Sequence, residues 1–155
     1  MKISSLPGVS IQTPGINFDK LLNFTRHYNL VPILNVYENI VLPVELDGGT
    51  VDRDFLDEVI HVLALEDKLK SMPNNLSGGQ QQHVAIARAL ITKPALLLAD
   101  EPTGNLDSKS SADVLRLLKL TGEKFKQTIV MITHNNEIAL LADRIVRIED
   151  GRIME

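Results

Sequence analysis

Two neighbouring carboxylates follow a short apolar run, and their position suits them to catalytic work. Asp100 and Glu101 directly follow the run 95–99, ALLLA. Such a run predicts a strand buried on both faces of a parallel sheet, and α/β sheets bind ligands at the carboxyl ends of their strands. One carboxylate there can hold Mg²⁺, which prefers hard oxygen ligands, and the next can orient or deprotonate a water. The alternative is an ordinary acidic pair where a strand leaves the sheet.

A second group of chemically suited residues opens a predicted helix. Ser77, Gly78 and Gly79 come before Gln80, and the serine with the glutamine three residues later has the pattern of a capping box. Free N–H groups and the helix dipole make such an end an anion site, and glycine lets a phosphate approach the backbone closely. A plain capped helix explains Ser77 equally well.

A histidine follows another apolar run. His134 comes after 128–132, TIVMI, which predicts a second buried strand, so the histidine also lies at a carboxyl strand end. A lone histidine there is more often a surface residue, and only its context gives it a function. His27 and His61 are interpreted as structural or solvent-facing.

The order and spacing of these motifs resemble one family. The segments are LSGGQQQHVAIARAL at 76–90, LLLADEPTGNLDS at 96–108 and ITHN at 132–135. They resemble the signature motif, the Walker B motif with the D-loop, and the switch histidine of ABC ATPases, and the resemblance covers about residues 27–155. YNLVPILNVYENIVLPVEL and HNNEIALLADRIVRIEDGRI resemble the branch that drives lipoprotein release, macrolide export and antimicrobial-peptide resistance.

The resemblance implies a role for each candidate residue, with ATP and Mg²⁺ as cofactors. Asp100 would bind Mg²⁺, Glu101 would act as the general base, and His134 would contact the γ-phosphate of ATP. Asp107, in the D-loop, would link the two active sites of an ATPase dimer. Contacts to the γ-phosphate of ATP held by the opposite subunit would come from the signature motif: Ser77, Gly78, Gly79 and Gln80.

The sequence also departs from the family pattern. No G-x-x-x-x-G-K-[ST] occurs in the 155 residues, and that loop normally cradles the β- and γ-phosphates. Arg26 stands where the Q-loop glutamine is expected, and His83 replaces an arginine that follows the signature glutamines. We therefore expect a truncated or internally deleted ATPase, with GVSIQTPGINFDKLLNFTR as a weak remnant of the region before the Q-loop.

Three functions stay open from the sequence. The first is the ATP-binding subunit of an ABC transporter, which couples ATP binding and hydrolysis to export or lipoprotein release, with a transmembrane permease and a second ATPase subunit as partners. The second is a non-catalytic signature-half module that serves a partner ATPase, or a degenerate inactive fragment. The third is an ABC-like ATPase of DNA repair or chromosome maintenance, against which stand the lack of a heptad tract and of a basic patch.

Composition restricts the class of protein further. Apolar residues make up 44 %, enough for a sizeable core, and the net charge of −4 gives no basic surface for nucleic acid. The absence of cysteine excludes disulfides and thiolate metal sites. Apolar stretches are far shorter than the roughly 20 residues of a membrane span. We expect a cytoplasmic protein, peripheral at the inner face of the cell membrane through the permease.

The elements that position these motifs alternate between helices and strands, which predicts an α/β fold with a mainly parallel sheet. By resemblance this is a partial P-loop NTPase (ABC ATPase) fold with a helical signature-motif subdomain. Helices are predicted at 35–46 (ended or interrupted near Pro43), at 52–65, from the Ser77 cap to Pro94, at 108–125 and at 136–142. Strands are predicted at 95–99, 128–132, 144–148 and 152–153, the last two around a turn at 150–151.

The domain organisation follows from the same pattern. Residues 1–26 are weakly patterned, and 27–155 form the partial ABC ATPase domain. Its helical subdomain is expected at about 35–92 and its Walker B, D-loop and switch-histidine core at about 93–155. By resemblance the strand that carries the phosphate loop lies beside 128–132, so we expect that strand to keep an open apolar edge.

Overall fold

The computed structural model describes residues 21–25, 28–150 and 152–154, the first of these segments by its backbone alone. The predictions for residues 1–20, Arg26, His27 and Gly151 concern positions outside these ranges.

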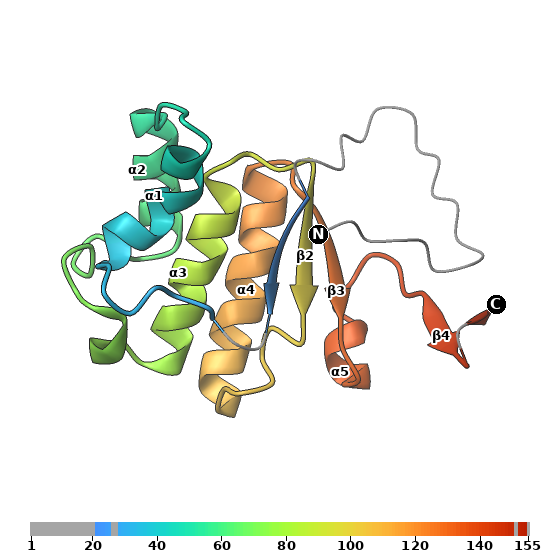
Figure 1. The fold of residues 1–155 in the computed structure, drawn as a ribbon. Helices are drawn as coiled ribbons and strands as arrows, with labels where there is room; N and C mark the ends of the chain where they lie inside the picture. Colours follow the sequence, from blue (N-terminus) through green and yellow to red (C-terminus); the bar gives the residue numbers. More distant parts are fainter. Residues whose placement is uncertain (1–20, 26–27, 151, 155) are drawn as a thin grey trace.

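Three parallel strands form the main sheet of the described chain (Figure 1). In spatial order they are β1 (Leu21–Thr25), β2 (Leu96–Asp100) and β3 (Thr128–Ile132). The register pairs Asp100 with Thr25 on one side and with Ile132 on the other, so the carboxyl ends of the three strands meet at one edge. The predicted α/β fold with a parallel sheet is confirmed.

Two long helices lie on one side of this sheet, α3 (Gly78–Leu90) and α4 (Ser108–Lys124) (Figure 1). Leu97 and Ala99 of β2 are fully buried, and they form one core with apolar residues of both helices. The predicted inward face of α4 is confirmed by three buried residues: Val114, Leu117 and Leu118. The core therefore lies between the helices and one face of the sheet.

The opposite face of the sheet is partly open. On β3, Val130 is 43 % exposed and Ile132 is 58 % exposed, while Ile129 and Met131, which alternate with them along the strand, pack against the core. The expectation that 128–132 is buried on both faces is therefore wrong, because the described residues cover only one face.

A second pair of helices packs beyond α3: α1 (Val36–Leu46) and α2 (Arg53–Val62). Helix α1 starts at a capping box in which Asn35 is the N-cap and Glu38 the partner. It continues through Pro43, so the expected interruption there is wrong. The proline removes one backbone donor, and we attribute the continuation to the tertiary burial of the helix, which usually outweighs local preference.

The remaining elements are short, and several bounds differ from the prediction. They are the 3₁₀ turn η2 (Pro73–Asn75), α5 (Asn136–Ala139), and the antiparallel strands β4 (Arg147–Glu149) and β5 (Arg152–Met154). Helix α5 ends before the predicted residue 142. Leu140 and Leu141 are 75 % and 60 % exposed, so further turns would gain little tertiary packing.

Strand β1 was missed by the sequence analysis, since it lies within the segment 1–26 that was expected to be weakly patterned. Its five residues, LLNFT, show neither an unbroken apolar run nor strict alternation, so periodicity does not assign them to a strand. Its place in the sheet depends on pairing with β2, which is distant in sequence.

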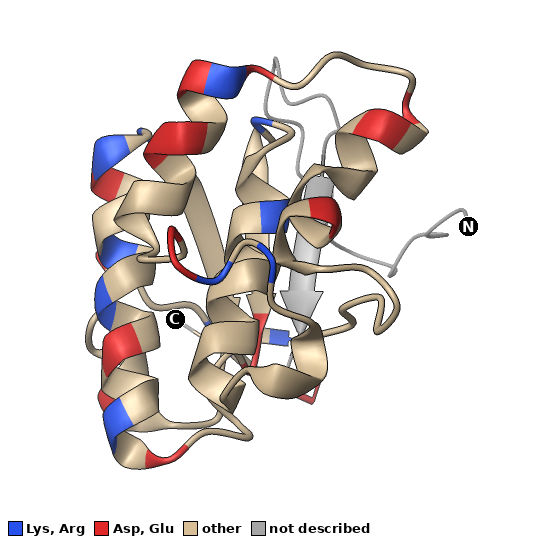
Figure 2. Ribbon diagram, turned by 90° about the vertical axis from the view of Figure 1, so that its left-hand side faces the viewer, with Lys and Arg blue, Asp and Glu red and all other residues tan. Residues whose placement is uncertain are grey.

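Charged residues are distributed without a single dominant sign on the face shown in Figure 2, where acidic and basic residues alternate along the helices. Among the described helices, none combines the length and the apolar character that crossing a membrane requires.

Candidate functional site

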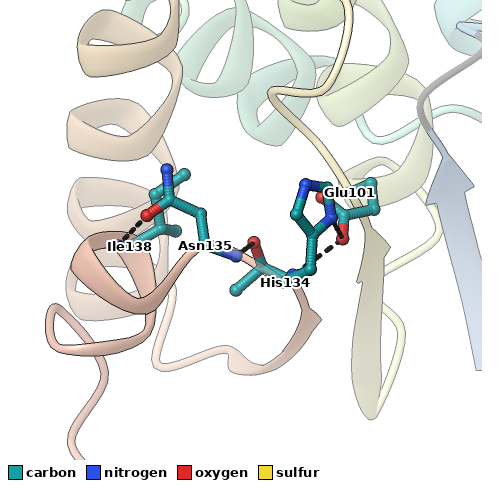
Figure 3. A network of polar contacts seen from close by, with 5 residues as sticks. Glu101, His134, Asn135 and Ile138 are labelled. Atoms are coloured by element: carbon teal, nitrogen blue, oxygen red, sulfur yellow. Dashed lines mark hydrogen bonds and ion pairs between the residues drawn. The ribbon is translucent and has the colours of Figure 1, made fainter.

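Glu101 and His134 meet at the carboxyl edge of the sheet (Figure 3). Glu101 directly follows β2, and His134 comes two residues after β3. Oε1 of Glu101 accepts the backbone N–H of His134 at 2.8 Å and lies 2.6 Å from Nδ1 of the same residue. Because an ionised carboxylate only accepts hydrogen bonds, this contact places a proton on Nδ1. In the neutral ring, Nε2 is then the acceptor nitrogen.

The backbone at Glu101 turns sharply out of the sheet. Its φ of 46° lies in the left-handed region, which is uncommon for a residue other than glycine and costs on the order of 1 kcal/mol. The Glu101 N–H donates to the carbonyl of Ile132 at 2.9 Å, which ties the turn to the end of β3. The turn leaves Asp100 exposed as the last residue of β2, while the Glu101 side chain is only 19 % exposed.

Two further residues fix the loop that carries His134 (Figure 3). Thr133 Oγ1 accepts the N–H of Asn135 at 3.1 Å. Asn135 Oδ1 accepts the N–H of Glu137 at 2.9 Å and of Ile138 at 3.4 Å, as the N-cap of α5. No role was predicted for these two residues, although an asparagine just before a helical segment is a usable N-cap signal.

The first turn of α3 has the predicted capping box. Ser77 Oγ accepts the N–H of Gln80 at 3.2 Å, and Gln80 Oε1 accepts the N–H of Ser77 at 2.9 Å. The side-chain oxygen of Gln80 is thus already occupied by a hydrogen bond within the chain. The helix start that the sequence predicts is confirmed, and Gly78 and Gly79 form its first two residues.

Asp107 caps α4 beside this turn. Its Oδ1 accepts the N–H groups of Lys109 and Ser110, both at 3.0 Å, and its Oδ2 accepts the Ser110 hydroxyl at 2.7 Å. These hydrogen bonds, with the backbone N–H of Ser110 first, lower the pKa of Asp107. A Cβ on Gly79 would lie 3.3 Å from Ser110 Cβ, so the starts of α3 and α4 are in close contact.

A small cavity of about 140 Å³ lies where these two helix starts meet. Its lining comes from α3, its cap and α4: Ser77, Gly79, Gln80, His83, Ser110 and Asp113. His83 is half-buried, and burial lowers the pKa of its imidazole. A neutral imidazole therefore stands where the family pattern has an arginine.

The predicted site residues form two groups. One is Glu101 with His134 at the sheet edge, next to the exposed Asp100, and the other is the α3 turn with Asp107. Within the described part of the chain, no hydrogen bond or ion pair joins the two groups. The same residues hold no cluster of three or more His, Cys, Asp or Glu side chains able to bind a metal ion. A magnesium ion at Asp100 would therefore need phosphate or water oxygens as well.

Comparison with known proteins identifies the family. Residues 17–104 match the ABC transporter family. The macrolide export ATP-binding/permease protein MacB of Syntrophobacter fumaroxidans is 46 % identical over 132 residues, which are 83 % of this chain and 18 % of that protein. The lipoprotein-releasing system ATP-binding protein LolD of Desulfotalea psychrophila is 42 % identical over 132 residues, 84 % of this chain and 59 % of that protein.

A solved structure gives the same result for the fold. The dimeric, post-hydrolysis state of the ATP-binding cassette MJ0796, bound to ADP and Pi, matches with a TM-score of 0.70 and 36 % identity over 87 % of this chain and 61 % of that chain. The chain belongs to the ABC transporter family, with the fold of an ATP-binding cassette. It spans less than two thirds of the length of each of these three relatives.

Proposed function

We propose that this chain is part of an ATP-binding subunit that couples ATP binding and hydrolysis to transport across a membrane, of the export or lipoprotein-release kind. The identities to the macrolide-export and lipoprotein-releasing proteins support this kind of transport. The observation that carries the proposal is the contact between Glu101 and His134, because it sets a carboxylate and an imidazole together at the sheet edge where α/β proteins bind ligands.

At this edge, the exposure of Asp100 and the contact between Glu101 and His134 fit the roles that we propose for these residues. Asp100 is exposed and able to contribute an oxygen to Mg²⁺, an ion that neutralises charge on phosphate groups when it is bound. Glu101 is the proposed general base for the attacking water. Its contact with His134 holds Nδ1, which leaves Nε2 for the proposed contact to the γ-phosphate. That contact uses the protonated ring, in which Nε2–H donates to a phosphate oxygen.

The first turn of α3 is the proposed contact to ATP held by a second ATPase subunit. Ser77, Gly78, Gly79 and Gln80 form a capped helix start, and such starts attract anions through their N–H groups and the helix dipole. Asp107 lies beside this turn through Ser110, which supports a role in linking the two sites of a dimer.

A membrane partner completes the proposal. No described helix is able to cross a membrane, so transport would require a transmembrane permease subunit that holds the chain at the inner face of the cell membrane. The transported substrate would be selected by that permease.

The test is nucleotide-dependent assembly. The purified chain is mixed with a full-length homologous ATPase that carries its own phosphate loop, with and without a non-hydrolysable ATP analogue. We expect a complex only with nucleotide, and we expect Ser77→Arg to abolish it because the side chain fills the anion site. Thr50→Arg, which adds the same side chain at an exposed loop position, is the matched control. A complex that forms without nucleotide, or that tolerates Ser77→Arg, overturns the proposal.

A second candidate function is a non-catalytic half-site that serves such a partner. It is favoured by the lack of a G-x-x-x-x-G-K-[ST] motif in the 155 residues, because positioning and charge neutralisation carry most phosphoryl-transfer catalysis. On this view the chain alone hydrolyses ATP no faster than background. Turnover by the chain alone that disappears in Glu101→Gln excludes the non-catalytic alternative.

A further inference from the structure

Arg88 ties the segment after β1 to helix α3. We call residues 28–35, which lead into α1, the strap. The Arg88 guanidinium donates from one nitrogen to the carbonyl of Asn29 at 2.8 Å and from the other to the carbonyl of Tyr28 at 2.9 Å. Two donors in a fixed fork suit two consecutive carbonyls in a way that a lysine ammonium does not. The side chain is half-buried. The bond to Tyr28 is partly buried, and the bond to Asn29 is exposed.

A second polar side chain holds the other part of the strap. Asn39 of α1 is fully buried. Its Oδ1 accepts the N–H of Val31 at 2.8 Å, and its Nδ2 donates to the carbonyls of Val31, Leu34 and Asn35 at 2.9 to 3.1 Å. The backbone of the strap is thus bound to α3 through Arg88 and to α1 through Asn39.

This arrangement sets the Tyr28 ring against the first turn of α3. A Cβ on Gly78 would lie 2.8 Å from Tyr28 Oη and 3.1 Å from Leu106 Cδ2. The first distance is too short for a real contact, so the space of a side chain at this position is already filled from within the chain. The contact with Tyr28 therefore requires a residue without a side chain at position 78, whether or not a ligand binds there.

Arg88 and Gly78 lie on the same helix, with Tyr28 between their levels. Ten residues of α-helix rise about 15 Å, which an extended arginine and a tyrosine ring can span together. Tyr28 thus contacts both residues: its carbonyl accepts from Arg88, and its Oη lies against Gly78.

We propose that Arg88 is a positioning residue for the Ser77–Gly79 turn and that it acts through Tyr28. By fixing the strap, Arg88 holds the tyrosine ring against Gly78, and this contact limits where the first turn of α3 lies. The inference rests on the proposed function, in which this turn contacts nucleotide on a second subunit.

The first arm of the test measures the position of Tyr28 without nucleotide. The chain has no tryptophan and two tyrosines, so Tyr37→Phe leaves Tyr28 as the single emitter for acrylamide quenching of fluorescence. We expect Arg88→Lys to increase quenching, because the forked donor pair is lost, and Gly78→Ala to increase it by displacing the ring. Arg53→Lys, at an exposed position on α2, is the matched control and leaves quenching unchanged.

The second arm measures nucleotide-dependent association with the full-length ATPase. Arg88→Lys and Tyr28→Leu are each expected to weaken association about tenfold or more, since small displacements of a positioned group are costly. Tyr28→Leu removes the ring but keeps the backbone carbonyl that Arg88 binds. If Arg88 acts through the ring, the double variant is no weaker than either single variant, because contacting residues that form one unit are non-additive. Circular dichroism verifies that each variant is folded.

The outcomes separate the inference from the proposed function. Increased quenching with non-additive loss of association supports the inference. Unchanged quenching in Arg88→Lys, unchanged association, or additive losses overturn it. If the parent chain does not associate with nucleotide present, the proposed function fails, and the functional role of Arg88 fails with it. The quenching arm then still shows whether Arg88 holds Tyr28 in place.

Discussion

One carboxylate oxygen of Glu101 holds both the backbone and the ring of His134, at 2.8 Å and 2.6 Å. The loops that leave β2 and β3 are therefore joined through a single side-chain atom. The Glu101 side chain is mostly buried, while the His134 ring is 78 % exposed. The contact therefore joins a carboxylate that is largely protected from solvent to a ring that solvent reaches. The geometry of this edge of the sheet should depend strongly on this carboxylate.

Removing the carboxylate should loosen the His134 loop. In Glu101→Ala, the His134 amide loses its acceptor, so we expect faster hydrogen exchange at that amide and a loss of stability of about 1 kcal/mol. Glu101→Gln keeps an acceptor oxygen and should give a smaller effect. Amide exchange by NMR and urea unfolding measure both quantities. Glu137→Ala, at an exposed position on α5, is the control, and equal exchange in Glu101→Ala and the parent would contradict the prediction.

The buried amide of Asn39 should be among the most sensitive polar groups of the helical layer. Asn39→Ala removes, at a fully buried position, the oxygen that accepts the Val31 N–H and the two amide hydrogens shared among three carbonyls. Unsatisfied buried groups cost about 1–3 kcal/mol each, and partial relaxation makes a total of about 2–3 kcal/mol reasonable. Urea unfolding checks this value against Asn74→Ala, an exposed asparagine. Equal unfolding free energies for the two variants would rule out the role given to Asn39.

Features set by neighbours in the sequence were predicted well. The capping box at Ser77 and Gln80 is present, and the predicted helix 108–125 corresponds to α4 with Phe125 as its C-cap. The bounds of β3 also agree with the predicted strand 128–132. Caps and apolar periodicity are local signals, so a sequence carries them directly.

Features set by distant contacts were predicted poorly. Among the described strands, β1 pairs with β2 alone, and the exposure of β3 depends on which segments cover the sheet. The candidate site shows the same division. The motifs located Glu101 and His134 at strand ends, but not the shared oxygen atom between them. Arg88 and Tyr28 carried no motif signal that revealed their contact with the strap and with Gly78.

Stability should depend on pH through His83. Burial lowers the pKa of this imidazole below its ordinary value of about 6.5. Above that pH both the folded and the unfolded chain hold the ring neutral, so it adds no pH dependence. As the pH falls from about 6.5 toward the folded-state pKa, the unfolded chain binds the proton first, and stability is lost.

Replacing His83 by a neutral residue should remove this part of the pH dependence. We expect the fall in the urea midpoint between about pH 7.5 and about pH 5.5 to be smaller in His83→Gln than in the parent. His61→Gln is the matched control, because it makes the same replacement at a ring that is 79 % exposed. An undiminished fall in His83→Gln would show that other groups cause the pH dependence.

The outer edge of β3 should make the chain prone to self-association. Within the described sheet, β3 pairs with β2 alone, and it presents Val130 and Ile132 on the open face. An apolar strand with a free edge invites pairing with another chain, and a lysine on such an edge opposes it. We therefore expect concentration-dependent association in sedimentation velocity and less of it in Val130→Lys. Leu120→Lys, at a position 39 % exposed on α4, adds the same charge away from the sheet and should leave association unchanged. A parent chain that stays monomeric at all concentrations and melts cooperatively at roughly 45–65 °C would show that the edge and the open face are already covered.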